Sequence, residues 1–118
     1  MTSGEYLQRA LHRCNTDTPN WYGWADVSAG ETYENVVVVK DGVTKPTLDE
    51  VNAKIAEVKL DELRGERNYR ISKTDWTQSP DSPLSDSDKT AWVTYRQSLR
   101  DITDTATSLE DVTWPTKP

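Results

Sequence analysis

The C-terminal half of the chain contains the stretch DWTQSPDSPLSDSDKTAWVTYRQSLRDI, which runs from Asp75 to Ile102. Its first part is punctuated by two prolines, Pro80 and Pro83. A proline pushes the residue before it away from helical geometry and towards an extended conformation. The segment from Asp75 to Leu84 is therefore expected to form a stiff, extended linker.

A helix is expected directly after this linker. Ser85 is followed three residues later by Asp88, a spacing that resembles a helix N-terminal capping box. Beyond it, apolar residues recur at helical spacing and define one face: Ala91, Trp92, Tyr95, Leu99 and Ile102. The apolar pattern fades after Thr103, and Trp114 is the only large anchor in the tail that follows. We expect Trp114 to pack back onto the module.

A second, longer helix is predicted upstream. Thr47 stands at the position of an N-cap, and Glu50 three residues later completes the pattern of a capping box. Apolar residues then follow in two adjacent stripes as far as about Lys73. Because glycine disfavours helix interiors, a kink or break is expected near Gly65.

The N-terminal part predicts a short helix and a small sheet. Apolar residues recur at helical spacing from Ser3, a plausible N-cap, to about Asn15. Turn residues then flank two candidate strands, Trp21 to Val27 and Tyr33 to Lys40. The β-branched run Val36–Val39 suits a strand that is buried on both faces or covered by a partner, and we favour covering within the chain.

These elements predict an α+β fold: a small, helix-dominated single domain with a β-hairpin or sheet in the N-terminal half. The C-terminal half is expected to be a helix, extended loop and helix module. We place a variable part at residues 1–63 and the module at residues 64–118, and we expect both to form one compact unit.

Aromatic residues are expected to carry much of the stability. Only 34% of the 118 residues are hydrophobic, and the chain has no Phe but five Trp and five Tyr. Trp76, Trp92 and Trp114 offer two alternatives, because aromatic rings are common both in cores and at interaction hot spots. We expect at least two of the three to lie in the core.

The charge pattern disfavours two classes of partner. The formal net charge is −6, and the largest basic cluster is the spaced set Arg64, Arg67 and Arg70. Because binding to phosphates depends on basic residues, neither nucleic acid nor an anionic membrane is an expected partner. A single cysteine, Cys14, and the lack of a charged leader or long apolar run are typical of a protein of a reducing cytoplasm.

No pattern indicates catalysis, a metal site or a cofactor. His12 and Cys14 are two residues apart and would diverge on a helix, so a surface His and a half-buried Cys are expected. Arg64, Arg67 and Arg70 are expected on one side of the long helix, and Arg96 and Arg100 on the side of their helix opposite its apolar face. Each set could hold a partner's carboxylates. Intramolecular pairs, such as Glu66 with Arg70, are the favoured alternative for the arginines.

Several short motifs of the C-terminal half occur in a set order: Asp75–Gln78, Pro80–Asp81, Pro83–Ser85, Ala91–Trp92, Tyr95–Gln97, Leu99–Ile102, and Trp114–Pro115 with Pro118. Together they resemble the bacteriophage tail assembly chaperone family over roughly Arg67 to Pro118. The resemblance implies a non-enzymatic assembly factor that binds a tail or tail-fibre protein in the host cytoplasm. No catalytic residues come with it.

The resemblance also indicates which residues form the core of the module or dock a partner: Trp76, Pro80, Pro83, Trp92, Tyr95, Arg96, Arg100 and Trp114. An alternative is a structural component of the virion in the tail, baseplate or neck. In that case the strand at Val36–Val39 would be completed by a neighbouring subunit or by self-association.

Overall fold

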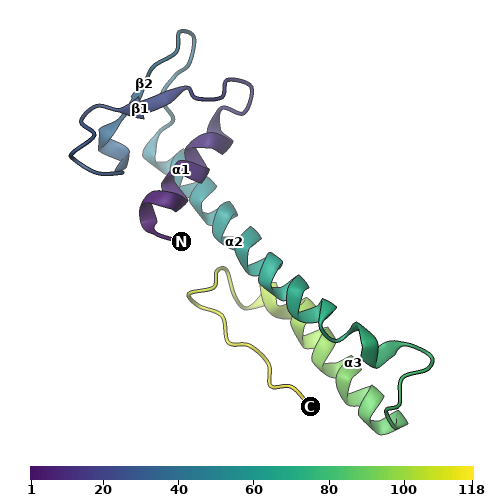
Figure 1. Cartoon of the computed structure of the whole chain (residues 1–118). Coiled ribbons are helices and arrows are strands. Elements are labelled where there is room, and N and C mark those ends of the chain that lie inside the picture. Colours follow the sequence, from purple (N-terminus) through teal and green to yellow (C-terminus); the bar gives the residue numbers. More distant parts are fainter. The chain divides into compact units, whose positions relative to one another are not determined.

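Helix α2 (Leu48–Ser72) is the longest element of the computed structural model, which describes all 118 residues. The chain divides into two units, Met1–Val58 and Lys59–Pro118, and α2 belongs to both. Helices predominate, and one two-stranded antiparallel sheet lies in the N-terminal half (Figure 1). The predicted α+β class is therefore confirmed. That the two parts work as one unit, with a boundary after residue 63, stays a prediction.

The first element of the N-terminal unit is helix α1 (Ser3–Cys14), which confirms the predicted helix. Its N-cap is Thr2, one residue earlier than expected. The hydroxyl of Thr2 accepts a hydrogen bond from the Glu5 N–H at 3.1 Å, and the Glu5 carboxylate accepts one from the Thr2 N–H at 3.1 Å. Thr2 and not Ser3 is the N-cap because only Thr2 has a glutamate three residues later, which completes the capping box.

The sheet consists of strands β1 (Tyr22–Trp24) and β2 (Val36–Val38), with Gly23 opposite Val37. Both strands are shorter than predicted. A 3₁₀ turn, η1 (Tyr33–Asn35), replaces the first part of the second strand. The Asn35 side chain then fixes the loop between the strands, because its amide donates to the carbonyls of Asp26 and Gly30 at 2.7 and 2.8 Å.

The valine run Val36–Val39 is buried on only one face of the strand. Val36 is 2% exposed, whereas Val37 is 37% and Val39 is 58% exposed. Successive side chains of a strand point to opposite faces, so only one set of valines reaches the core. The expectation that the run is buried on both faces within the chain is therefore wrong.

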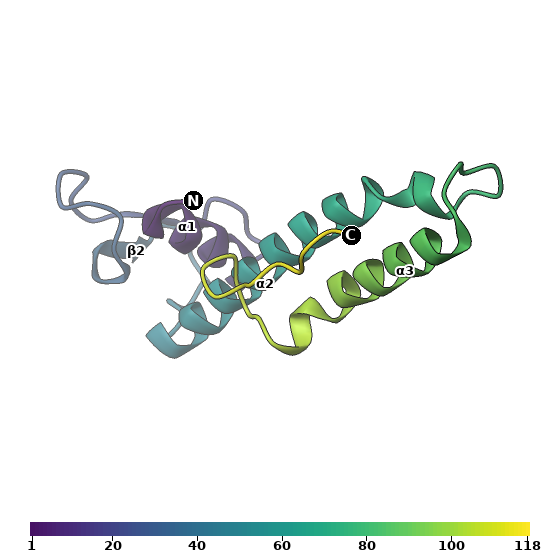
Figure 2. The same cartoon turned by 90° about the horizontal axis from the view of Figure 1, so that it is seen from below.

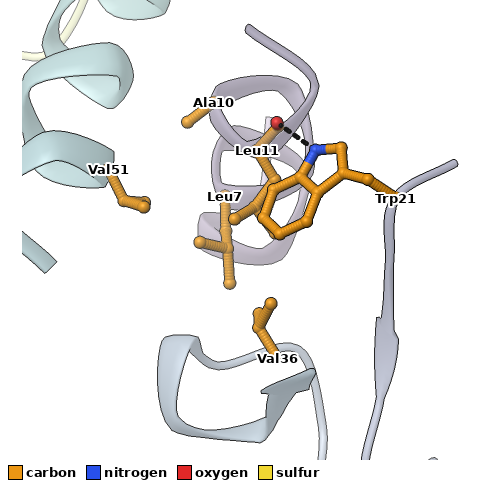
Figure 3. Packing of buried hydrophobic residues seen from close by; sticks show 6 residues of the cluster. All are labelled: Leu7, Ala10, Leu11, Trp21, Val36 and Val51. Atoms are coloured by element: carbon orange, nitrogen blue, oxygen red, sulfur yellow. Dashed lines mark hydrogen bonds between the residues drawn. The ribbon is translucent and has the colours of Figure 1, made fainter. Parts of the chain in front are cut away.

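The core of the N-terminal unit forms between α1, the sheet and the start of α2. Its buried cluster, drawn in Figure 3, consists of Leu7, Ala10, Leu11, Trp21, Val36 and Val51. Trp21 is 1% exposed, and its indole N–H donates to the carbonyl of Leu11 at 2.9 Å. The bond satisfies the polar tip of the ring, so the large apolar surface of Trp21 is buried without an unpaired donor.

Helix α2 begins where the sequence predicted. The Thr47 hydroxyl accepts a hydrogen bond from the Glu50 N–H at 3.2 Å, as expected of an N-cap. The helix continues unbroken through Gly65, so the expected break is wrong. A single mid-helix glycine costs only about 1 kcal/mol relative to alanine, which the many strong helix formers on either side offset.

The C-terminal unit is a helical hairpin followed by a tail. The 3₁₀ turn η2 (Asp75–Gln78) connects α2 to helix α3 (Asp86–Arg100), and η3 (Asp101–Asp104) follows. In Figures 1 and 2 the C-terminal part of α2 and α3 lie side by side and run in opposite directions. Leu63 on α2, and Tyr95, Leu99, Ile102 and Ala106 beyond it, are buried.

The linker between the two helices differs from the expectation in its first half. Asp75–Gln78 form a helical turn, so the segment from Asp75 to Leu84 is not extended throughout. The reason is that Pro80 restricts only the residue before it, and the four residues Asp75–Gln78 stay free to coil. The predicted cap at Ser85 is confirmed, because its hydroxyl accepts a hydrogen bond from the Asp88 N–H at 3.2 Å.

Candidate docking surface

Two buried threonines stabilise the turn η2 through hydrogen bonds. Thr74 is 2% and Thr77 is 0% exposed. The Thr74 N–H and hydroxyl both donate to the carbonyl of Ile71, at 2.9 and 2.7 Å. The Thr77 hydroxyl in turn donates to the Thr74 carbonyl at 2.6 Å. The bonds to Ile71 satisfy a carbonyl that the end of α2 leaves without a helical partner, and the bond from Thr77 to Thr74 holds the turn in one conformation.

Arg96 on α3 reaches across to the same turn. Its Nη1 donates to the hydroxyl of Thr74 at 2.8 Å, to the carboxylate of Asp75 at 2.8 Å and to the carbonyl of Ile71 at 3.3 Å. The Arg96 side chain is only 12% exposed. Arg96 therefore faces the turn and fixes it to α3, instead of lying opposite the apolar face as expected.

A row of aromatic rings runs from solvent into the hairpin. The ring centroids of Trp76 and Trp92 are 6.0 Å apart, and those of Trp92 and Tyr95 are 5.7 Å apart in an edge-to-face arrangement. Tyr95 is buried and Trp92 is half-buried, whereas Trp76 is 52% exposed. Such ring contacts stabilise the arrangement in addition to the stabilisation that comes from burying the rings.

The expectation that two of the three C-terminal tryptophans lie in the core is wrong. Trp92 and Trp114 are half-buried and Trp76 is exposed, and the buried tryptophan of the chain is Trp21. The reason is the length of the hairpin: two helices offer one narrow seam, which Leu63, Tyr95 and the aliphatic residues of α3 and η3 already fill.

Val93 is an exposed apolar residue of α3. It is 48% exposed and follows Trp92 directly on α3. Val93 also lies three residues before Arg96, and residues at that spacing share a helix face. We call Trp76, Trp92 and Val93 the aromatic patch. Val93 was not among the predicted site residues, although its position beside Trp92 was a visible signal.

The other predicted site residues lie away from this patch or at its edge. Pro80 and Pro83 are exposed in the loop between η2 and α3. Arg100 is exposed at the far end of α3, where its side chain reaches only Gln97, at 3.5 Å. The Trp114 ring lies 4.0 Å from the guanidinium carbon of Arg70, so the tail packs back onto α2 as predicted. The predicted Glu66–Arg70 pair is also present, at 3.0 Å.

His12 and Cys14 both lie on α1. His12 is exposed and Cys14 is half-buried, as expected, and burial raises the pKa of the Cys14 thiol above its ordinary value of 9.0. No three His, Cys, Asp or Glu side chains are grouped so that they could hold a metal ion. None of the helices combines the length and the apolar character needed to span a membrane.

The aromatic patch lies on a turn that is fixed from two sides, and exposed aromatic side chains are common at the hot spots of protein interfaces. The family model for phage tail assembly chaperone proteins matches residues 60–118, which are 59 of the 118 residues and so half of the chain. The chain belongs to the phage tail assembly chaperone family, and its function lies in phage tail assembly. The resemblance of the motifs in this half is thereby confirmed.

One solved structure is also similar. It is the solution structure of protein CV0426 from Chromobacterium violaceum, with 31% sequence identity over 75% of this chain and 93% of that chain, and a TM-score of 0.44. No curated protein matches the chain.

Proposed function

We propose that the chain is a non-enzymatic assembly factor that binds a tail or tail-fibre polypeptide through the aromatic patch, in the host cytoplasm during morphogenesis. The observation that carries the proposal is the exposure of Trp76, 52%, on a turn held by Arg96 and two buried threonines. Membership of the tail assembly chaperone family supports a role in assembly.

Fixing the turn favours binding because little freedom is lost when a partner arrives. Immobilising a flexible side chain or loop at an interface costs about 0.5–1.5 kcal/mol for each side chain. Trp76 already contacts Trp92, and the backbone beneath it is held by the Thr74 and Thr77 bonds. The indole is therefore ordered before a partner binds.

The patch predicts an apolar partner surface. Trp76 and Val93 together present an indole and a branched aliphatic side chain, which bury well against other apolar groups. If the chain covers an apolar surface of the tail polypeptide, aggregation of that polypeptide is prevented before assembly.

The experiment is a pull-down from cells that produce the phage, with the wild-type chain and two variants as bait. Trp76→Ala removes the exposed indole of the patch. Leu109→Ala is the matched control, because Leu109 is also an exposed apolar residue, 39%, of the same unit. Its neighbour Glu110 pairs with Lys59 at the start of the unit.

We expect the wild-type chain and the Leu109→Ala variant to recover a tail or tail-fibre protein that the Trp76→Ala variant does not recover. Equal recovery by Trp76→Ala would refute the patch as the docking surface. Recovery of no tail protein by the wild-type chain would refute the proposed function itself. Mass spectrometry of purified particles adds one criterion, since a fixed number of copies per virion would indicate a structural component instead.

A further inference from the structure

A second feature of the C-terminal unit is a shallow hollow between α2 and the tail. Its volume is about 200 Å³, and its lining comes from one face of α2 and from the tail: Glu66, Tyr69, Arg70, Lys73 and Lys117. The tail is held against α2 by the contact of Trp114 with Arg70. We call this feature the basic hollow. It does not include any residue of the aromatic patch.

The charges of the basic hollow are opposite in sign to those of the unit that contains it. Residues 59–118 have 9 basic and 11 acidic side chains, a net charge of −2. Three cations but only one carboxylate line the hollow, a net charge of +2. The carboxylate of Glu66 is already paired with Arg70 Nε at 3.0 Å. Lys73 and Lys117 have no carboxylate partner in the structure.

Arg70 is fixed in an orientation that suits an anion. Its guanidinium lies 4.0 Å from the Trp114 ring on one side, and its Nε is bound to Glu66. The two Nη groups have no acceptor, which leaves four N–H donors of the planar fork available. Lys73 is held nearby, with its ammonium 5.1 Å from the centre of the Tyr69 ring. A guanidinium stacked on an indole loses little freedom when it binds a carboxylate.

We propose that the basic hollow binds an acidic segment of the polypeptide partner, with a Glu or Asp carboxylate at Arg70 and further carboxylates at Lys73 and Lys117. The proposal rests on the proposed function, because it describes the chemistry of a protein partner. Tyr69, 56% exposed, offers an apolar wall for the aliphatic part of the segment.

Protein carboxylates fit the hollow better than the phosphates of nucleic acid. A volume of about 200 Å³ admits one or two side chains and no groove-long contact. Nucleic acid binding depends on many cations along an extended surface. The chain carries a net charge of −6, so a long polyanion would be repelled over most of its length.

The test is an NMR titration of the full chain with hexaglutamate, followed through backbone amide shifts. The double variant Lys73→Gln with Lys117→Gln removes two cations from the hollow. Its control is Arg64→Gln with Lys89→Gln, which removes the same charge elsewhere in the unit. Hexathymidylate DNA is titrated in parallel as a phosphate probe.

We expect hexaglutamate to shift the amides of residues 66–73 and 113–117, and added salt to weaken the effect. The affinity should fall roughly fourfold in the hollow variant, since each of the two exposed ion pairs contributes a factor of about two, and it should stay unchanged in the control. No localised shift, an equal loss in both variants, or tighter binding of the DNA would each overturn the proposal.

This result is separable from that of the pull-down. If the tail protein is recovered through Trp76 and hexaglutamate does not bind, the hollow has no part in recognition and the proposed function stands. If hexaglutamate binds at the hollow and no tail protein is recovered, the hollow binds acidic segments and the proposed function fails.

Discussion

Replacement of Arg96 by methionine tests whether the turn beneath the aromatic patch is held by α3. Methionine keeps most of the aliphatic length of the side chain, so the change removes the guanidinium and little packing. Arg100→Met is the matched control. It is the same substitution four residues later on α3, at a side chain that is exposed and reaches only Gln97.

The expected loss follows from the three acceptors of Arg96. The bond to the Thr74 hydroxyl is part-buried and 2.8 Å long, and its loss should cost about 1–2 kcal/mol. The 3.3 Å bond to the Ile71 carbonyl adds about 0.5 kcal/mol. The Asp75 side chain is 65% exposed, so that ion pair adds about 0.5 kcal/mol or less. The sum is about 2–3 kcal/mol, against at most about 0.5 kcal/mol for Arg100→Met.

Urea unfolding followed by far-ultraviolet circular dichroism measures both free energies of unfolding. Arg96→Lys adds a second criterion, because one ammonium cannot replace the planar fork and should recover only part of the loss. High salt should reduce the difference only slightly, since the largest contribution comes from an uncharged acceptor. If Arg96→Met and Arg100→Met lose the same free energy, the account of the fixed turn is wrong.

Three further predictions concern single residues. Trp21→Phe removes the donor to the Leu11 carbonyl and part of a buried ring, and should lower the free energy of unfolding by about 2–4 kcal/mol in urea titrations. Gly65→Ala, with nothing within 4 Å of the added methyl, should raise that free energy by about 0.5–1 kcal/mol. Hydrogen bonds from the Ser108 N–H and from Thr107 lower the pKa of Asp111 below its ordinary 3.8. The stabilisation of this loop by the Asp111 carboxylate is therefore fully present above pH 3.8 and is lost as the pH falls through the lowered pKa. A pH titration of the NMR chemical shift of the Thr107 amide checks this, with Asp111→Asn as the comparison.

Local signals in the sequence predicted the helices well. The pairs Thr47–Glu50 and Ser85–Asp88 each combine a capping hydroxyl with an acidic residue three positions later, and both caps are present in the structure. These features depend on a few neighbouring residues, so a single sequence contains the information. The same rule, applied to Glu5, would have placed the first cap at Thr2.

The features that sequence analysis missed depend on contacts between distant residues. Trp21 is buried because its indole meets a carbonyl ten residues earlier, and Arg96 turns towards Thr74, 22 residues away. The exposure of Val37 depends on which face of β2 the helices cover. The spacing of residues in the sequence does not predict such distant partners, because a tertiary contact overrides the preference of a short segment.

The candidate site was predicted in part. The sequence selected Trp76, Trp92, Tyr95 and Arg96, which the structure brings together, but it also selected Arg100 and Trp114, which lie elsewhere. Val93 and the basic hollow were not predicted. Their recognition requires knowing which side of α3 faces η2 and where the tail lies on α2.

The central claim is that the aromatic patch binds a tail polypeptide during assembly. Its most direct test is the yield of infectious particles from a phage whose gene for this chain carries Trp76→Ala, compared with Leu109→Ala. Loss of a hot-spot tryptophan should weaken binding by about 2 kcal/mol, roughly thirtyfold, so the yield and the number of complete tails should fall. A normal yield from the Trp76→Ala phage, with the variant chain folded and present at the usual level, would contradict the account.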